Sequence, residues 1–89
     1  MTFEWDEPKN VTNREKHGVS FEDAQFAFAD PFRLVVRDNE HSTPTEERFF
    51  CYGKVNDSVL TVRFTLRGEA IRIFGAAHWR LGVKCYENR

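Results

Sequence analysis

The chain has 89 residues, of which 40% are hydrophobic and 15% aromatic, and its formal net charge is −1. This composition favours a folded chain over a disordered one, and the length suits one domain with one modest core, which we expect to span residues 1–89. Because no stretch approaches the roughly 20 apolar residues of a membrane-spanning helix and the first residues lack a secretory pattern, we expect a cytoplasmic protein with no membrane partner.

Two helices are predicted before any clear strand. The first follows Asp6 as its N-cap, carries Pro8 in its first turn and stops at Gly18. It has few apolar residues, so we expect much of it to be exposed. The second begins after Ser20 and ends at Asp30-Pro31. Its apolar face is formed by Phe21, Ala24, Ala27 and Phe28.

Strands and a last helix follow. Alternating apolar and polar residues predict four strands, over residues 32–37, 46–52, 59–66 and 69–74. Residues 79–88 are interpreted as a short helix. The predicted fold class is therefore α+β, with two N-terminal helices packed on a four-stranded antiparallel sheet and a short C-terminal helix. Cys51 and Cys85 have no paired spacing, so we interpret them as reduced thiols.

Two turns set the predicted strand registers. With Asn56-Asp57 as a two-residue turn, Phe50 lies opposite Arg63. With Arg67-Gly68 as the next turn, Arg63 lies opposite Arg72. Like charges directly opposite each other destabilise a sheet unless an anion lies between them, so this pair indicates an anion site. In the alternative interpretation a nearby carboxylate neutralises the two arginines, and the candidates are Glu46, Glu47 and Glu69.

The three histidines differ in what surrounds them in the sequence. His17, with Lys16, ends the first helix, where a cation is favourable for structural reasons but an imidazole could also transfer protons. His78 follows the last strand with Arg80 close behind, and it is either a catalytic or RNA-contacting residue or a plain surface residue. His41 lies in an acidic loop and is interpreted as structural. Their spacing fits no metal-ligand motif, so no metal site is expected.

Aromatic residues share the predicted arginine side of the sheet. In the register above, Phe50 and Tyr52 lie on the same side as Arg48 and Arg63. They could stack on unpaired bases, or they could pack beneath the C-terminal helix. An ion pair between Glu47 and Arg48 is expected at the strand edge.

An ordered series of residues carries a family resemblance. The series is Phe3-Glu4-Trp5-Asp6, Lys9, Asn13, Lys16-His17-Gly18-Val19-Ser20-Phe21-Glu22-Asp23-Ala24, Phe28-Ala29-Asp30-Pro31, Asp38, His41-Ser42, Glu47-Arg48, Gly53, Arg72-Ile73 and Tyr86-Glu87. It resembles the BrnT-type toxins of bacterial type II toxin–antitoxin pairs. Many members have Ile-Ser-Ala-Arg before a strongly basic last helix. This chain instead resembles a branch with Gly-Ala-x-x-Trp-Arg, here Gly75 to Arg80.

The resemblance implies a RelE-like fold and a metal-independent endoribonuclease that inhibits translation and needs no cofactor. It also implies a cognate antitoxin of the ribbon-helix-helix type, with DNA contacted only through the antitoxin complex. In such cleavage the RNA 2′-OH attacks the adjacent phosphate with the help of a base, an acid and cations. The predicted catalytic residues are Arg63, Arg72, His17 and His78, and the predicted RNA contacts are Lys16, Arg48, Arg80 and Tyr52. The alternative is a non-catalytic binding module of the same fold, acting through an antitoxin or RNA.

Overall fold

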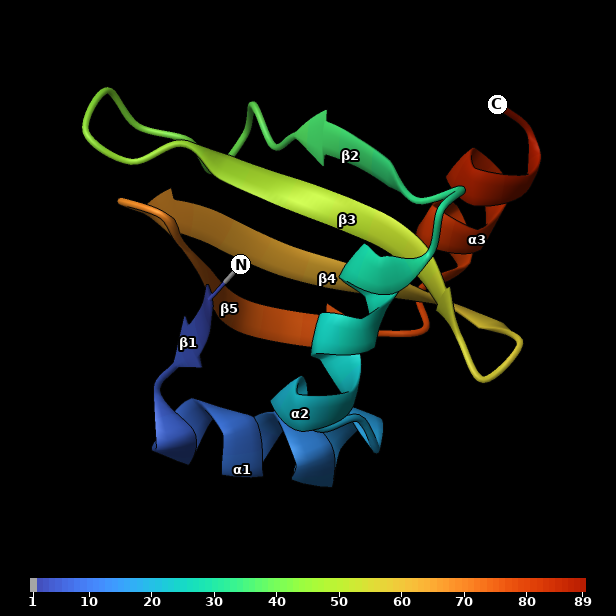
Figure 1. Cartoon of the computed structure of the whole chain (residues 1–89), viewed down its shortest axis with the longest axis horizontal. Helices are drawn as coiled ribbons and strands as arrows, with labels where there is room; N and C mark the ends of the chain where they lie inside the picture. The colour runs from blue at the N-terminus through green and yellow to red at the C-terminus, as the bar shows by residue number, and fades with distance from the viewer. Residues whose placement is uncertain (1) are drawn as a thin grey trace.

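A five-stranded mixed sheet forms the centre of the computed structural model, which describes residues 2–89. The strand order is β1-β5-β4-β3-β2 (Figure 1). In chain order the elements are β1 (Thr2–Trp5), α1 (Glu7–His17), α2 (Phe21–Ala24), the 3₁₀ helix η1 (Gln25–Ala29), β2 (Leu34–Arg37), β3 (Arg48–Val55), β4 (Ser58–Arg67), β5 (Ala70–Ala77) and α3 (Arg80–Glu87).

The α+β class is confirmed, but the prediction of four antiparallel strands is wrong. β1 adds a fifth strand, parallel to β5, in which Glu4 lies beside Arg72. A strand of four residues shows too little alternation to be recognised from its sequence. The second helix is also shorter than predicted, because α2 makes a single α-helical turn and continues as η1. Its start is as predicted, since the Ser20 side chain accepts a hydrogen bond from Asp23 N–H.

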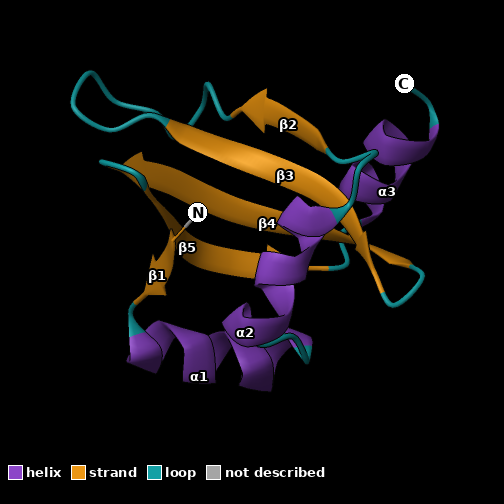
Figure 2. Cartoon of the chain, in the orientation of Figure 1, coloured by secondary structure: helices purple, strands orange, loops and turns teal. Residues whose placement is uncertain are grey.

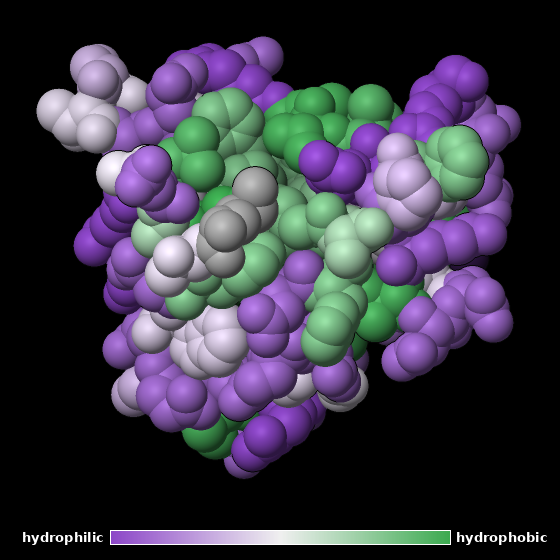
Figure 3. Space-filling view, in the orientation of Figure 1, coloured by the Kyte–Doolittle hydropathy of each residue, from purple (hydrophilic) through white to green (hydrophobic). Residues whose placement is uncertain are grey.

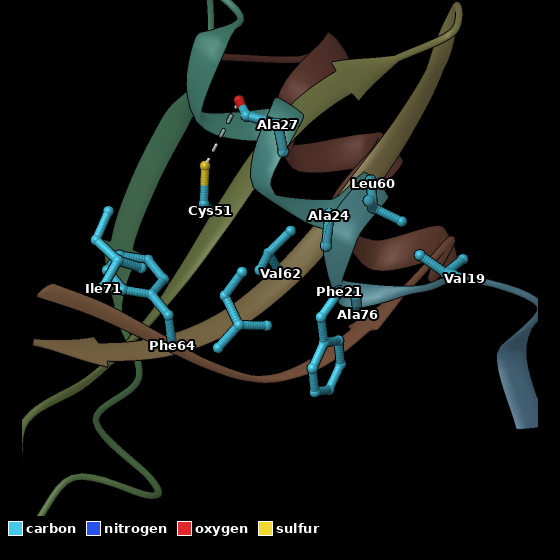
Figure 4. Close-up of a cluster of buried hydrophobic side chains, with 11 residues drawn as sticks. Val19, Phe21, Ala24, Ala27, Cys51, Leu60, Val62, Phe64, Ile71 and Ala76 are labelled. Atoms are coloured by element: carbon cyan, nitrogen blue, oxygen red, sulfur yellow. Dashed lines mark hydrogen bonds between the residues drawn. The ribbon is translucent and has the colours of Figure 1, made fainter. Parts of the chain in front are cut away.

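The helical elements are divided between the two faces of the sheet (Figure 2). α2 and η1 cover one face, and their apolar side chains pack with those of β3, β4 and β5 into the core shown in Figure 4. Cys51 lies inside this core, where burial raises the pKa of its thiol to about 12. Both Cys51 and Cys85 are free, as predicted. No helix within residues 2–89 is long and apolar enough to span a bilayer.

The outward side of α1 is exposed and hydrophilic, as predicted, and the corresponding lower part of Figure 3 is mainly purple. Its buried residues are two asparagines rather than apolar residues. Asn10 accepts a hydrogen bond from Phe21 N–H and thereby holds α1 against α2. Asn13 accepts a hydrogen bond from Ala76 N–H at 3.2 Å and donates one to Ala76 C=O at 2.8 Å. Its amide therefore takes the place of a neighbouring strand at the edge of β5, beyond the end of β1.

The register between β3 and β4 is as predicted, whereas the register between β4 and β5 is not. Asn56 and Asp57 form the first turn, both with positive φ, and Phe50 lies opposite Arg63. The second turn is formed by Gly68 and Glu69 rather than by Arg67 and Gly68. Gly68 has φ +60°, which a glycine at the first position of a two-residue loop adopts readily.

α3 lies on the other face of the sheet and approaches β3 and β4 at a glycine. A β-carbon at Gly82 would overlap Thr61 Oγ1 and touch the ring of Tyr52. The end of α3 is held by the Tyr86 hydroxyl, which donates a hydrogen bond to Asp30 at 2.6 Å. α3 therefore covers only the part of this face that lies over Thr61 and Tyr52.

Replacing Asn13 by alanine should destabilise the protein by about 3 kcal/mol, because the buried N–H and C=O of Ala76 would each lose a partner. Urea unfolding of Asn13→Ala measures this loss. Thr12→Ala, on the exposed side of the same helix, is the matched control and should change stability by less than about 0.5 kcal/mol. Equal effects of the two substitutions would contradict the edge role of Asn13.

Gly82→Ala should lower the thermal unfolding midpoint, although alanine is about 1 kcal/mol better than glycine inside a helix. The reason is that the new methyl group would push α3 away from Thr61. Thr61 Oγ1 has no hydrogen-bond partner among the described residues, so Thr61→Ala removes no hydrogen bond. The double variant Gly82→Ala with Thr61→Ala should therefore recover most of the loss. A Gly82→Ala protein as stable as the unmodified chain would disprove the close packing of α3.

Candidate active site

The side of the sheet opposite the core carries three arginines on adjacent strands. We call the surface formed by Arg48, Arg63, Arg72 and Phe74 the arginine face. Arg48 and Arg72 lie on either side of Thr65, which is paired with both of them. The arginine face lies on the same side of the sheet as α3, next to the part that α3 covers.

The predicted pairing of Arg63 with Arg72 is wrong. The turn at Gly68 and Glu69 places Arg72 opposite Thr65. A β-bulge between Arg63 and Phe64 shifts the register by one more residue, so Arg63 lies opposite Gly75. Arg72 instead forms an ion pair with Glu4 of β1, with 2.7 Å between Nη1 and Oε2. The neutralising carboxylate comes from a strand that the sequence pattern did not reveal, and it is none of the three glutamates considered from the sequence.

Phe74 connects the two remaining arginines. The bulge leaves Phe74 without a partner on β4, and its ring lies under both guanidinium groups. The central guanidinium carbon is 4.5 Å from the ring centroid for Arg48 and 5.4 Å for Arg63, within the range of cation–π contacts. Arg63 forms no ion pair with any residue in the described range 2–89. It therefore presents the one unneutralised charge of the arginine face.

Arg48 is held by Glu46 and not by Glu47, so the predicted Glu47–Arg48 pair is wrong. Arg48 Nε lies 2.8 Å from Glu46 Oε1, and the hydrogen bond and charge of Arg48 keep the pKa of Glu46 below its usual value. Glu47 pairs with Arg37 at 3.0 Å. Successive side chains along a strand point to opposite faces, which separates Glu47 from Arg48.

Lys16 and His17 reach the border of the arginine face from the end of α1. Together with Phe74 and the side of α1 they line a shallow cleft of about 240 Å³. The His17 ring also packs edge-on against Trp79, with 5.6 Å between ring centroids. The structure thus brings Lys16 and His17 to the ring that lies beneath Arg48 and Arg63.

His78 does not join this group. Its Nδ1 lies 3.0 Å from the carbonyl oxygen of Val59, at the end of β5 that is remote from Arg72. Six residues of extended chain separate the two positions, or about 20 Å. Arg80 is exposed at the start of α3, next to Trp79.

Tyr52 is buried with 5% of its surface exposed, so the packing alternative describes it correctly. Its ring is covered by α3 and is not available to stack on a base. Burial, the largest cause, raises the pKa of its hydroxyl, and nearby Cys85 adds to this effect. Trp79, with 37% exposed, and Phe50 instead border a cleft of about 390 Å³ between α3 and the sheet.

Alternation with Arg72 predicts Phe74 on the arginine side of the sheet, and the structure confirms this position. No sequence pattern locates the bulge at Phe74 or predicts that its ring lies beneath two guanidinium groups. The sequence likewise does not predict the contact of Trp79 with His17. Within residues 2–89, no three histidine, cysteine, aspartate or glutamate side chains are grouped so that they could hold a metal ion.

Comparison with models of known protein families shows the family to which the chain belongs. The family model for the ribonuclease toxin BrnT of type II toxin–antitoxin systems matches residues 5–80. The chain belongs to the BrnT family. No curated protein gives a significant match to it. The residues matched to the BrnT model run from the end of β1 to the start of α3, and thus include the whole arginine face. As a type II toxin family, BrnT implies an antitoxin partner.

Glu4→Gln should strengthen the binding of a single-stranded RNA oligonucleotide, because Arg72 would lose its carboxylate partner and become free for a phosphate. One added phosphate contact steepens the dependence of log Kd on log salt by about 0.7. Fluorescence anisotropy over a range of salt concentrations measures both quantities. Glu87→Gln removes an equal charge at the far end of α3 and should leave the slope unchanged. An unaltered slope for Glu4→Gln would show that Arg72 does not reach the RNA.

Proposed function

We propose that this BrnT-family chain is an endoribonuclease toxin that cleaves RNA with its own side chains and without a metal ion. It inhibits translation in the cytoplasm and is neutralised by a cognate antitoxin of the ribbon-helix-helix type, through which the pair contacts DNA. The fold would accordingly be RelE-like. The observation that carries the proposal is the unneutralised guanidinium of Arg63 beside Arg48, above Phe74.

This arrangement suits the charge that develops during RNA cleavage. When the 2′-OH attacks the neighbouring phosphorus, negative charge grows on the non-bridging oxygens. Arg63 has no competing carboxylate among residues 2–89, so its fork of N–H donors is free to bind these oxygens. Arg48 adds a second positive charge, and its contacts with Phe74 and Glu46 restrict its position. Preorganised donors of this kind typically contribute about 10²–10³ to the rate.

The cleft beside Phe74 supplies the remaining cations. Lys16 and His17 line it, and an RNA strand that crosses the arginine face would pass close to them. Trp79 packs against His17 just before α3, and the exposed Arg80 follows it in the chain. We therefore assign phosphate binding along the strand to Lys16 and Arg80. We assign to His17 the role of candidate acid for the leaving 5′-oxygen.

A second candidate function is a binding module of the same fold that does not cleave. It is favoured by the ion pair that occupies Arg72 and by the hydrogen-bond contact of His78 with Val59, because two of the four predicted catalytic side chains are already engaged. Such a module would act through its antitoxin or by holding RNA. The two functions differ in one measurable property, the appearance of cut RNA.

Arg63→Ala should lower the rate of RNA cleavage by about 100-fold, because it removes the free guanidinium. End-labelled RNA incubated with the purified chain, in the presence of EDTA, measures the rate and also tests metal independence. Arg63→Lys keeps the charge but loses the fork, and should recover only part of the activity. Arg14→Ala removes an exposed arginine of α1 and is the matched control.

Three outcomes would contradict the proposal in different ways. If the unmodified chain leaves RNA intact, the binding module is the correct function. If it cleaves only without EDTA, a metal takes part. If Arg63→Ala cleaves as fast as Arg14→Ala, the arginine face is not the site.

A further inference from the structure

One buried carboxylate outside the groups described above orients a histidine at the edge of the arginine face. Asp38 is 5% exposed and accepts a hydrogen bond from the backbone N–H of His41 at 3.2 Å. The second oxygen of the carboxylate lies 2.8 Å from Nδ1 of the same histidine. The His41 side chain remains 48% exposed. Its ring is thus anchored at Nδ1, and Nε2 is free to exchange a proton with another molecule.

The loop that carries this pair is fastened to Arg48. Asp38 N–H donates a hydrogen bond to the carbonyl oxygen of Arg48 at 2.7 Å, which continues the pairing of β2 with β3 by one residue. The Ser42 hydroxyl accepts a hydrogen bond from Arg48 N–H and donates one to the carbonyl oxygen of Asp38. The loop therefore has a fixed shape, determined by contacts with the backbone of a residue of the arginine face.

The register places the Asp38 side chain on the same side of the sheet as the Arg48 side chain. Residues directly opposite each other in antiparallel strands point to the same face, with β-carbons about 5 Å apart. The charge of Asp38 accordingly contributes to the raised pKa of Tyr52, which also lies on this face. The His41 ring, which contacts Asp38, therefore lies beside the backbone of Arg48 at the border of the arginine face.

His41 differs from the other two histidines in its partner. Within residues 2–89 it is the histidine that contacts a carboxylate, whereas His17 packs on Trp79 and His78 contacts a carbonyl oxygen. Burial raises the pKa of Asp38, but the hydrogen bonds and the charge of His41 outweigh it and hold this pKa below its usual value. Asp38 therefore stays ionised and can stabilise a protonated imidazole ring.

We propose that His41 is the general base of the RNA cleavage proposed above, and that Asp38 is the residue that positions it. The inference rests on that proposed function. It changes the interpretation of His41, which the sequence analysis took to be structural, and it gives the arginine face the proton acceptor that the arginines cannot supply.

The step is a transesterification. Nε2 of His41 accepts the proton of the 2′-OH while the 2′-oxygen forms a bond to phosphorus and the bond between phosphorus and the 5′-oxygen breaks. The leaving 5′-oxygen takes its proton from an acid or from water, and the product is a 2′,3′-cyclic phosphate. Asp38 keeps its negative charge and stabilises the imidazolium that forms. The charged side chains that surround the pair are Arg37, Glu40, Glu46, Glu47 and Arg48.

His41→Ala should reduce cleavage of labelled RNA by at least about 100-fold, the usual contribution of a positioned base. Because His41 is exposed, the variant should keep the fold, which circular dichroism and thermal unfolding check. Glu40→Gln, the exposed neighbour in the same loop, is the matched control and should cleave at the unmodified rate. A substrate with a 5′-thio leaving group needs no acid, so the defect of His41→Ala should persist on it.

Asp38→Asn tests the positioning role. The amide keeps a hydrogen-bonding group in place but no longer stabilises the protonated ring. The acidic limb of the profile of kcat/KM against pH should therefore move to lower pH, with a loss of at least about tenfold at the optimum. If Asp38 had only a structural role, Asp38→Asn would lower kcat/KM without moving the acidic limb of its pH profile.

The outcomes separate this inference from the proposed function. If the unmodified chain cleaves RNA and Arg63→Ala does not, while His41→Ala cleaves normally, the base assignment is wrong and the proposed function stands. If the 5′-thio substrate restores the rate of His41→Ala, His41 is the acid and the base assignment is also wrong. If the unmodified chain does not cleave at all, both fail.

Discussion

The register of β5 is the constraint on which the remaining structure depends. β5 is hydrogen-bonded to β4 on one side, and on the other side to β1 and then to the Asn13 amide. Alternation places Arg72 and Phe74 on the arginine face, and the bulge at Phe74 then places Ala76 opposite Val62 in the core. A shift of one residue would exchange the two faces of this strand. The core and the candidate site therefore share one structural determinant.

The sequence predicted local features well and long-range pairing poorly. Gly18, Ser20 and the Asn56-Asp57 turn were found because each carries a short-range signal with a physical cause. The β4–β5 register was missed because a loop with one glycine is compatible with two registers, and only burial of the whole strand selects between them. β1 was missed since its partner lies far away in the chain. No local signal in the sequence predicts that Asn13 is buried against Ala76 at the edge of β5.

The same difference between local features and long-range pairing applies to the prediction of the candidate site. The arginine-rich side of the sheet, with Arg48 and Arg63 upon it, was predictable from alternation in β3 and β4. The partners of these side chains were not, because ion pairs depend on which strands become neighbours. One row of paired residues crosses the sheet and has an acidic residue at each end. It consists of Asp38, Arg48, Thr65, Arg72 and Glu4. This distribution offsets the repulsion between the arginines. Arg63, in the next row, has no ion-pair partner in the described part of the chain.

The parallel pairing of β1 with β5 has a consequence for the order of folding. β1 is synthesised first, but its partner strand is synthesised only about 70 residues later. A nascent chain therefore contains β2, β3 and β4 before β1 can pair with β5. Until β1 pairs, Phe3 and Trp5 do not pack against the core. Contacts of such high sequence separation also slow folding. The ion pair between Glu4 and Arg72 thus belongs to the completed chain, and a translating ribosome carries this protein with Arg72 still unneutralised or not yet made.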